Sequence, residues 1–155
     1  MAYRDESHVH VVGVAGVGMS AVAQALKDAG HEVSGSDRFL DDGKTLDVLA
    51  CLRHAGIRLT PQDGSAITDR TACIVVSTAI ENDNPDLQRA RDLGVPVVHR
   101  AEMIARLAAG RRLLAITGTA GKTTVTGLIG YLCAEAGLDP VVINGGAVTN
   151  WRAPD

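Results

Sequence analysis

Short runs of β-branched and other apolar residues alternate along this chain with longer segments of helical periodicity. The short runs are 10–14, 32–36, 57–59, 73–77, 95–98, 113–117 and 141–143, and the helical segments are 19–29, 45–55, 85–93, 101–109 and 122–136. Strands separated by helices of this length form βαβ units, in which the strands are parallel and helices cover both faces of the sheet. The pattern therefore predicts an α/β fold with a Rossmann-like, doubly wound parallel sheet.

Composition and charge exclude several classes of protein. The 155 residues include 15 lysines and arginines against 18 aspartates and glutamates, and only 3% of them are aromatic. Without clustered positive charge or aromatic faces, we expect no nucleic-acid partner. No run of about 18 apolar residues is present, so we expect no membrane-spanning helix. The three cysteines are far apart in the sequence, which is typical of a reducing compartment and predicts the cytoplasm.

The first glycine loop, Gly-Val-Ala-Gly-Val-Gly at 13–18, lies between the first predicted strand and the first predicted helix. Doubly wound folds bind phosphate groups here, because glycines let the backbone approach the anion and the helix N-terminus offers unbonded N–H groups. Asp37 lies 19 residues beyond Gly18, where an acid can bind a ribose hydroxyl. Ala15 replaces the middle glycine of the dinucleotide fingerprint. Alone, this loop fits NAD, FAD or a nucleotide-sugar, or a tight turn that binds nothing.

The second glycine loop, Ile-Thr-Gly-Thr-Ala-Gly-Lys-Thr-Thr at 116–124, follows a predicted strand and opens a predicted helix. That is the context of a P-loop, in which backbone amides surround phosphates, Lys122 reaches the β- and γ-phosphates and Thr123 binds Mg²⁺. The match is partial, because Ile116 stands where the strict pattern has its first glycine. A dehydrogenase has no use for this loop. Together the two loops indicate an ATP-driven enzyme that acts on a nucleotide-linked substrate.

In these and further motifs the chain resembles the Mur ligases, the ATP-dependent amino-acid ligases of peptidoglycan synthesis. The likeness extends from residue 9 to residue 146. Its motifs are Gly-Thr-Ala-Gly-Lys-Thr-Thr at 118–124, Val-Gly-Val-Ala-Gly-Val-Gly-Met-Ser at 12–20, Val-Ser-Gly-Ser-Asp at 33–37, Val-Ser-Thr-Ala-Ile at 76–80, Asn-Pro at 84–85, Arg-Ala-Glu-Met at 100–103, Asp-Pro at 139–140 and Gly-Gly at 145–146. Within the family, they are most similar to the branch that adds L-alanine to UDP-N-acetylmuramate.

The resemblance implies a three-domain parent protein, of which this chain holds only a part. Residues 1–110 correspond to a UDP-substrate domain, and residues 111–155 to the truncated β-P-loop-α-β opening of an ATP-binding domain. The boundary falls at 108–112, where small and charged residues separate two apolar patterns. In the parent enzyme, ATP and Mg²⁺ convert the lactyl carboxylate of UDP-N-acetylmuramate to an acyl phosphate, which the amine of L-alanine attacks. We expect this chain alone to bind the UDP-sugar without catalysing ligation.

The resemblance also implies which residues form the sites. The substrate site is expected at the first glycine loop and the nearby strand ends, with Arg100 close to a phosphate or carboxylate. Its residues are Gly13, Ala15, Gly16, Val17, Gly18, Met19, Ser20, Asp37, Ser77, Thr78, Ala79 and Arg100. The ATP site comprises Gly118, Thr119, Ala120, Gly121, Lys122, Thr123 and Thr124. Lys122 and Thr123 are the expected catalytic residues, and Thr123 is the expected Mg²⁺ ligand.

Three departures from the family's pattern keep other acceptor chemistries open. Ala120 stands where this branch usually has histidine, Pro61-Gln62 replaces a usual Gly-His pair, and Ala15 replaces a common glycine. The first alternative is a murein-recycling ligase that adds an intact peptide to UDP-N-acetylmuramate and shares most of these motifs. The second is a UDP-sugar or dinucleotide-binding module without catalysis. The sequence predicts no oligomeric state.

Two further expectations concern polar residues outside the glycine loops. Asn84 precedes a proline at the first turn of the predicted helix 85–93 and is expected to cap that helix. His8 and His10 alternate at the start of the first strand, and two histidines alone are not expected to form a metal site.

Overall fold

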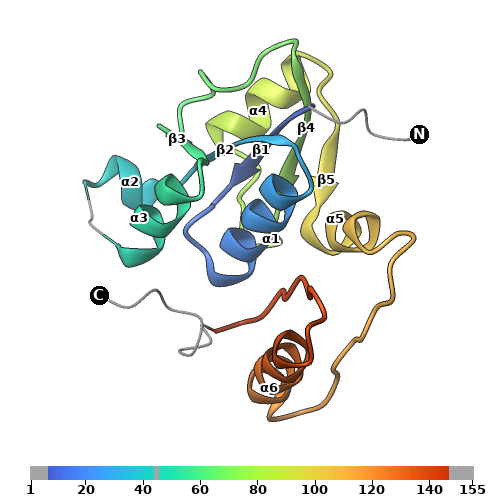
Figure 1. Cartoon of the computed structure of the whole chain (residues 1–155). Coiled ribbons are helices and arrows are strands. Elements are labelled where there is room, and N and C mark those ends of the chain that lie inside the picture. The colour runs from blue at the N-terminus through green and yellow to red at the C-terminus, as the bar shows by residue number, and fades with distance from the viewer. Residues whose placement is uncertain (1–6, 44–45, 147–155) are drawn as a thin grey trace.

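The computed structural model describes residues 7–43 and 46–146, and its centre is a five-stranded sheet (Figure 1). The strands are β1 (His8–Val12), β2 (Glu32–Ser36), β3 (Arg58–Thr60), β4 (Thr71–Val76) and β5 (Val97–His99), in the spatial order β3-β2-β1-β4-β5. The helices are α1 (Val17–Asp28), α2 (Arg38–Asp41), α3 (Asp47–His54), α4 (Pro85–Asp92), α5 (Arg100–Leu107) and α6 (Lys122–Glu135). All strand pairs are parallel, which confirms the predicted doubly wound α/β class.

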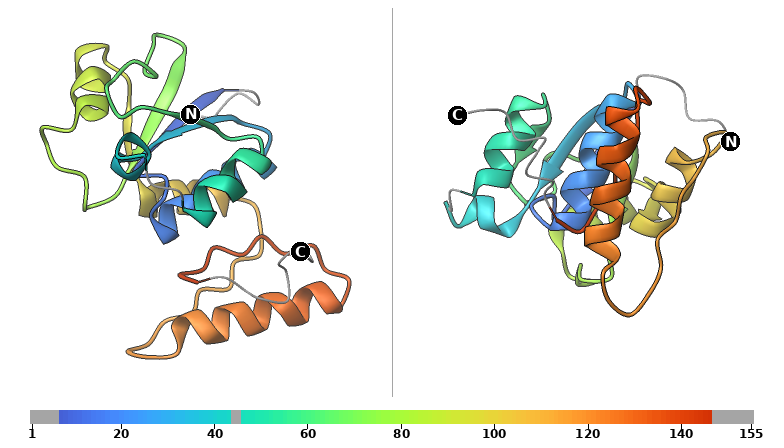
Figure 2. Two further views of the ribbon diagram at one scale, coloured as in Figure 1. Left: turned by 90° about the vertical axis from the view of Figure 1, so that its left-hand side faces the viewer. Right: turned by 60° about the horizontal axis from the view of Figure 1, so that its bottom comes forward.

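Helices cover both faces of the sheet, each face with its own apolar cluster. On one face, Val9 and Val11 of β1 pack with Leu26 of α1 and with residues of α3 and α5. On the other face, Val12 packs with Leu87 of α4. Figure 2 shows α4 on the opposite side of the sheet from α1, α3 and α5. Because successive side chains of a strand point to opposite faces, alternate residues of β1 serve the two clusters.

The predicted elements between residues 8 and 107 all have counterparts that agree within two residues at each end. β2 occupies 32–36 as predicted, whereas β1 ends before Gly13, whose φ of +72° turns the chain. In α3, helical spacing predicts that Leu49, Ala50 and Leu52 face inward. Leu49 and Leu52 are buried, but Ala50 is exposed, so the prediction for Ala50 is wrong. Ala50 lies about 100° around the helix from Leu49 and faces away from the buried stripe. The predicted start of this helix at Thr45 lies outside the described residues.

Beyond α5, the described residues contain only the helix of the predicted β-loop-α-β unit. α6 matches the predicted helix 122–136 to within one residue, but 113–117 and 141–143 form no strand, so those two predictions are wrong. A helix satisfies its own backbone hydrogen bonds, whereas a strand needs a neighbour to pair with. Among the described residues these segments pair with no strand, and Leu113 and Leu114 are exposed. None of the described helices is long and apolar enough to span a membrane.

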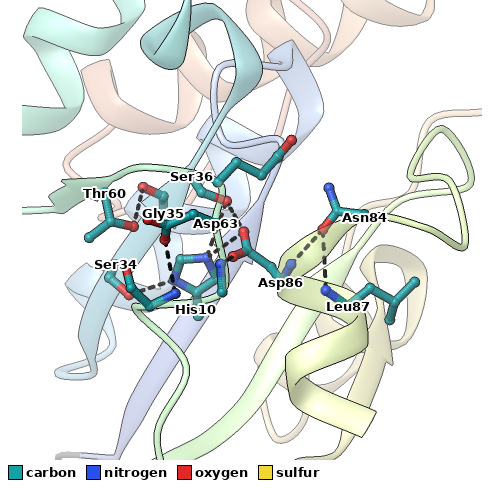
Figure 3. Close-up of polar contacts among 12 residues, drawn as sticks. His10, Ser34, Gly35, Ser36, Thr60, Asp63, Asn84, Asp86 and Leu87 are labelled. Carbon is teal, nitrogen blue, oxygen red and sulfur yellow. Dashed lines mark hydrogen bonds and ion pairs between the residues drawn. The ribbon is translucent and has the colours of Figure 1, made fainter. Parts of the chain in front are cut away.

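Polar side chains are buried between the sheet and α4, and Figure 3 shows part of this group. His8 and His10 of β1 and Asp86 of α4 are 8%, 0% and 0% exposed. Burial alone would raise the pKa of Asp86. Hydrogen bonds from His10, Ser36 and the Gly64 amide outweigh burial and hold that pKa below its ordinary value. Asp86 is therefore an ionised carboxylate in the interior of the protein at neutral pH.

Stability is expected to fall in mild acid because of His8. Burial, reinforced by His10 and Arg58 and opposed by Glu32, lowers the pKa of His8 below its ordinary value of 6.5. As the pH falls below about 6.5, the unfolded chain takes up a proton at His8 and the folded chain does not, so the free energy of unfolding decreases. We expect a lower melting temperature at about pH 5.5 than at about pH 7.5, and a smaller decrease in His8→Gln. Thermal unfolding of both proteins measures this, and equal pH dependence would show that His8 is not responsible.

A second stability prediction concerns Gly35 in β2, where space rather than backbone conformation requires glycine. A Cβ at Gly35 would lie 2.7 Å from Cβ and Cγ2 of Val14. We expect Gly35→Ala to lower the free energy of unfolding by about 1–3 kcal/mol, as overpacking does. Val14→Ala removes two of the clashing carbons, so the double variant should lose less than the sum of the single losses. Urea unfolding of the three variants measures this coupling, and strictly additive losses would contradict the contact.

Candidate functional site

The first glycine loop is fastened to the end of the neighbouring strand β2. The amides of Gly13 and Val14 both donate to the carbonyl oxygen of Ser36, at N···O distances of 2.9 and 3.0 Å. Gly13 adopts a left-handed backbone conformation, which glycine tolerates without steric cost. The loop is therefore held in one shape by the fold before any ligand binds.

Asp37, the residue after β2, holds the next amide of the loop. One carboxylate oxygen of Asp37 accepts from the Ala15 amide at 2.9 Å, and the other accepts from the Phe39 amide at 3.0 Å and so caps α2. The side chain is 5% exposed. The structure thus places Asp37 at the loop, as predicted, and shows a positioning role that the sequence reasoning missed. Its 19-residue spacing from Gly18 suggested only a ribose contact.

Two amides at the start of α1 remain without an acceptor. The Gly16 amide donates within the loop, and the amides of Met19 and Ser20 both donate to the Gly16 carbonyl at 2.8 Å. Among the described residues, no acceptor is bonded to the amides of Val17 and Gly18. A helix N-terminus carries a partial positive charge as well as unbonded donors, and it attracts anions. Of the five amides from Ala15 to Met19, these two are available to an anion.

Arg100 brings a positive charge to the same helix end. It is the first residue of α5, and its Nη1 atom lies 2.7 Å from the position that a Cβ on Gly18 would occupy. Gly18 therefore allows the guanidinium to lie directly against the start of α1. No ion pair joins Arg100 to an acidic side chain in the described part of the chain. A cation is unfavourable at the positive end of a helix, and an anion bound between the two would relieve that repulsion.

The segment after β4 borders the same site. The strand order reverses between β1 and β4, and doubly wound folds bind ligands at such a switch point. Ser77 Oγ accepts from the Ala79 amide at 3.3 Å, and Thr78 and Ala79 are exposed. Ile80 Cδ1 lies 3.2 Å from the position of a Cβ on Gly13. The structure therefore brings the predicted strand-end residues beside the first glycine loop.

The second glycine loop has the backbone features of a phosphate-binding loop. Gly118 and Gly121 have φ values of +144° and +76°, conformations that favour glycine. The first hydrogen bond of α6 runs from the Val125 amide to the Gly121 carbonyl at 2.9 Å. Among described residues, the amides of 119–124 are bonded to no acceptor. The ammonium group of Lys122 folds over the loop and donates to the carbonyl oxygens of Gly118 and Thr119.

The Asn-Gly-Gly segment at 144–146 lies against the start of α6. Asn144 Nδ2 donates to the Thr123 carbonyl at 3.1 Å, and Thr123 Oγ1 is 3.3 Å from the position of a Cβ on Gly145. The unbonded amides and the lysine ammonium are hydrogen-bond donors that fit the phosphates of a nucleoside triphosphate. The threonine hydroxyl oxygen fits a ligand of the accompanying metal ion. No hydrogen bond joins this loop to the first glycine loop within the described residues. The structure therefore shows two separate candidate sites.

A family model described as the Mur ligase family, catalytic domain, matches residues 8–112. UDP-N-acetylmuramate–L-alanine ligases from Sinorhizobium medicae and Bradyrhizobium diazoefficiens are 45% and 43% identical to this chain over 92% and 96% of its length. The chain spans only 29% and 31% of the length of these relatives.

Solved structures have the same fold. The UDP-N-acetylmuramate–alanine ligase of Thermotoga maritima has a TM-score of 0.72 and 30% identity, covering 83% of this chain and 29% of its own. A UDP-N-acetylmuramate:L-alanyl-gamma-D-glutamyl-meso-diaminopimelate ligase from Neisseria meningitides has a TM-score of 0.80 at 24% identity, covering 95% of this chain and 45% of its own. Since the family model covers the sheet, its helices and the first glycine loop, this chain belongs to the Mur ligase family.

Proposed function

We propose that residues 1–110 bind UDP-N-acetylmuramate and that the whole protein is an ATP-dependent ligase that joins L-alanine to this substrate. The observation that carries the proposal is that Arg100 lies beside the unbonded amides of Val17 and Gly18 at the switch point of the sheet. A diphosphate supplies the negative charge that this arrangement lacks. The names of the relatives at 43–45% identity supply the specific substrates.

In this proposal, the residues around the first glycine loop bind different parts of the UDP-sugar. Val17 and Gly18 donate to the diphosphate, and Arg100 neutralises part of its charge. Asp37 has unused lone pairs on its two carboxylate oxygens, because each accepts one backbone amide, and these can accept from a ribose hydroxyl. Ser77, Thr78 and Ala79 line the approach to the sugar at the end of β4.

Residues 111–155 are proposed to begin an ATP-binding unit. The amides of 118–124 would hold the phosphates, Lys122 would lie against the transferable phosphate, and the Thr123 hydroxyl would bind Mg²⁺. ATP supplies the phosphoryl group that activates a substrate carboxylate. Lys122 must release its bonds to the carbonyls of Gly118 and Thr119 to reach that phosphate, so we expect the loop to adjust on binding. Ala120 contributes only its backbone amide, because its side chain has no polar group.

The alternative acceptor, an intact peptide, has weaker support. Both sequence relatives compared above are named as L-alanine ligases, whereas the structure named for a peptide-bearing substrate is 24% identical and shows the fold alone. We propose the cytoplasm as the location. Among the described residues, Cys51, Cys73 and Cys133 form no disulfide, which fits a reducing compartment.

Substrate binding by this chain can be measured by titration calorimetry with UDP-N-acetylmuramate. We expect Arg100→Ala to weaken binding roughly tenfold or more, the effect of losing a charge-assisted hydrogen bond. Gly18→Ala should also weaken binding, because its methyl group displaces the guanidinium, while leaving the melting temperature unchanged or raised, since alanine favours helix. Arg70→Ala is the matched control, because Arg70 is exposed and precedes the amino end of β4, whereas the site lies at the carboxyl ends of the parallel strands.

The same titration distinguishes the alternatives. Binding of NAD in place of UDP-sugars would overturn the proposed substrate and favour a dinucleotide-binding module. Equal affinities in the wild type and Arg100→Ala would remove Arg100 from the site.

Catalysis is tested in the full-length protein with Lys122→Ala. We expect turnover to fall by a factor of about one hundred or more, equivalent to losing about 3 kcal/mol of transition-state stabilisation from one preorganised donor. Lys27→Ala is the control, because Lys27 lies in the last turn of α1, away from both glycine loops. Ligation is followed by phosphate release in the presence of L-alanine. Near-normal turnover by Lys122→Ala would exclude the proposed role.

A further inference from the structure

A continuous row of buried polar side chains crosses the face of the sheet beneath α4. Its members come from β1, β2, β4 and α4 and are at most 8% exposed. In spatial order they are Thr71, His8, Ser34, His10, Ser36 and Asp86. Figure 3 shows the half of this row that runs from Ser34 through His10 and Ser36 to Asp86. We call these six residues the polar row.

Short contacts join each member to the next. Thr71 Oγ1 is 3.2 Å from His8 Nδ1, and His8 Nε2 is 2.7 Å from Ser34 Oγ. Ser34 Oγ is also 2.7 Å from His10 Nδ1, and His10 Nε2 is 3.2 Å from Ser36 Oγ. The Ser36 hydroxyl then donates to Asp86 Oδ2. The row is thus an unbroken sequence of hydrogen bonds from the start of β4 to the start of α4.

The two ends of the polar row determine the direction of the bonds between them. At one end, the Thr68 amide donates to Thr71 Oγ1 at 3.0 Å, and a backbone amide can only donate. At the other end, the ionised carboxylate of Asp86 can only accept. Since Ser36 has one hydroxyl hydrogen and gives it to Asp86, its oxygen accepts from His10 Nε2–H, which also lies 3.4 Å from Asp86 Oδ2.

The same reasoning extends along the rest of the row. Ser34 gives its hydrogen to His10 Nδ1 and accepts from His8 Nε2–H, and Thr71 gives its hydrogen to His8 Nδ1. Both histidines are then neutral, with the proton on Nε2. A doubly protonated His10 would reverse the bonds of Ser34 and His8 and leave the Thr71 hydroxyl hydrogen without an acceptor among the described residues. All donors therefore point toward Asp86.

Ser36 connects the polar row to the first glycine loop. Its hydroxyl belongs to the row, and its carbonyl oxygen accepts from the amides of Gly13 and Val14. Asp86 is itself held in place, because its Oδ1 accepts from the Gly64 amide at 2.8 Å and it lies at the start of α4. A carboxylate anchored in this way restrains the end of β2, and that strand end holds the loop.

We propose that the Asp86 end of the polar row, formed by His10, Ser36 and Asp86, is a positioning device for the first glycine loop, in which Asp86 holds Ser36 so that the unbonded amides at the start of α1 face the ligand. The proposal rests on the proposed function of that loop as a diphosphate site. Asp86 and His10 are positioning residues, because they act through Ser36 and do not touch the ligand. Helix α4, which lies on the opposite face of the sheet from α1, thus contributes to a site at the start of α1.

Hydrogen exchange and ligand titration of the 155-residue chain test this proposal together. We expect Ser36→Ala and Asp86→Asn to speed exchange of the amides of Gly13 and Val14, and to weaken UDP-N-acetylmuramate binding roughly tenfold. Thr71→Val is the matched control, because it removes a buried hydroxyl from the far end of the same row. It should destabilise the protein while leaving loop exchange and affinity unchanged.

A conservative variant and a spectroscopic signature separate positioning from general destabilisation. Ser36→Thr retains the hydroxyl and should keep the slow exchange of the loop amides. If Asp86→Asn fails to fold, the comparison of loop-amide exchange in Ser36→Ala and Ser36→Thr still tests the positioning role. Proton–nitrogen correlation spectra of the histidine rings should show the Nε2–H form for both His8 and His10 at about pH 7.5. A charged His10 would overturn the inferred direction of the bonds.

The outcomes for the two proposals are distinguishable. A wild-type chain that binds no UDP-N-acetylmuramate would overturn the proposed function, while loop exchange in the variants would still decide the role of the polar row. Unchanged loop exchange in Ser36→Ala would overturn the positioning role even if the ligand binds. Equal loss of loop protection in Thr71→Val would also overturn it, because the effect would then follow from stability alone.

Discussion

The candidate site at the first glycine loop depends on the hydrogen bonds that the end of strand β2 makes with that loop. Ser36 and Asp37 bind the amides of three consecutive loop residues, Gly13 to Ala15, with a backbone carbonyl and a carboxylate. These bonds use up the donors that the turn itself would otherwise leave exposed. As a consequence, within the described residues the loop and the start of α1 keep only the amides of Val17 and Gly18 unbonded, and these lie beside Arg100. The fold therefore holds this candidate site in one shape before any ligand binds.

Most of the fold follows from local sequence signals. The apolar runs and the helical periodicity located the elements between residues 8 and 107 except the short helix α2, and Asn84 caps α4 as its position before Pro85 predicts. The predictions at 113–117 and 141–143 were wrong because an apolar run becomes a strand only beside a partner. Helix α6 formed in the same region because its hydrogen bonds are internal.

Some roles could not be predicted because they depend on residues far apart in the sequence. His8 and His10 gave no signal beyond their alternation along β1, and their partners are 24 to 63 residues away. Asp86 follows Pro85 at the start of a helix, and no local sequence signal distinguishes it, yet it is fully buried. The requirement for glycine at 18 and 35 likewise arises from the approach of Arg100 and Val14, which no local pattern reveals.

The sequence by itself determined the family, the doubly wound sheet and the location of two glycine loops, because glycine spacing, helix periodicity and lysine placement are local properties. The tertiary structure decided which loop amides stay unbonded, that Arg100 lies against the start of α1, and that a buried carboxylate fastens the end of β2. These features depend on hydrogen bonds and close contacts between distant segments. Such contacts exist only after the sheet has brought those segments together.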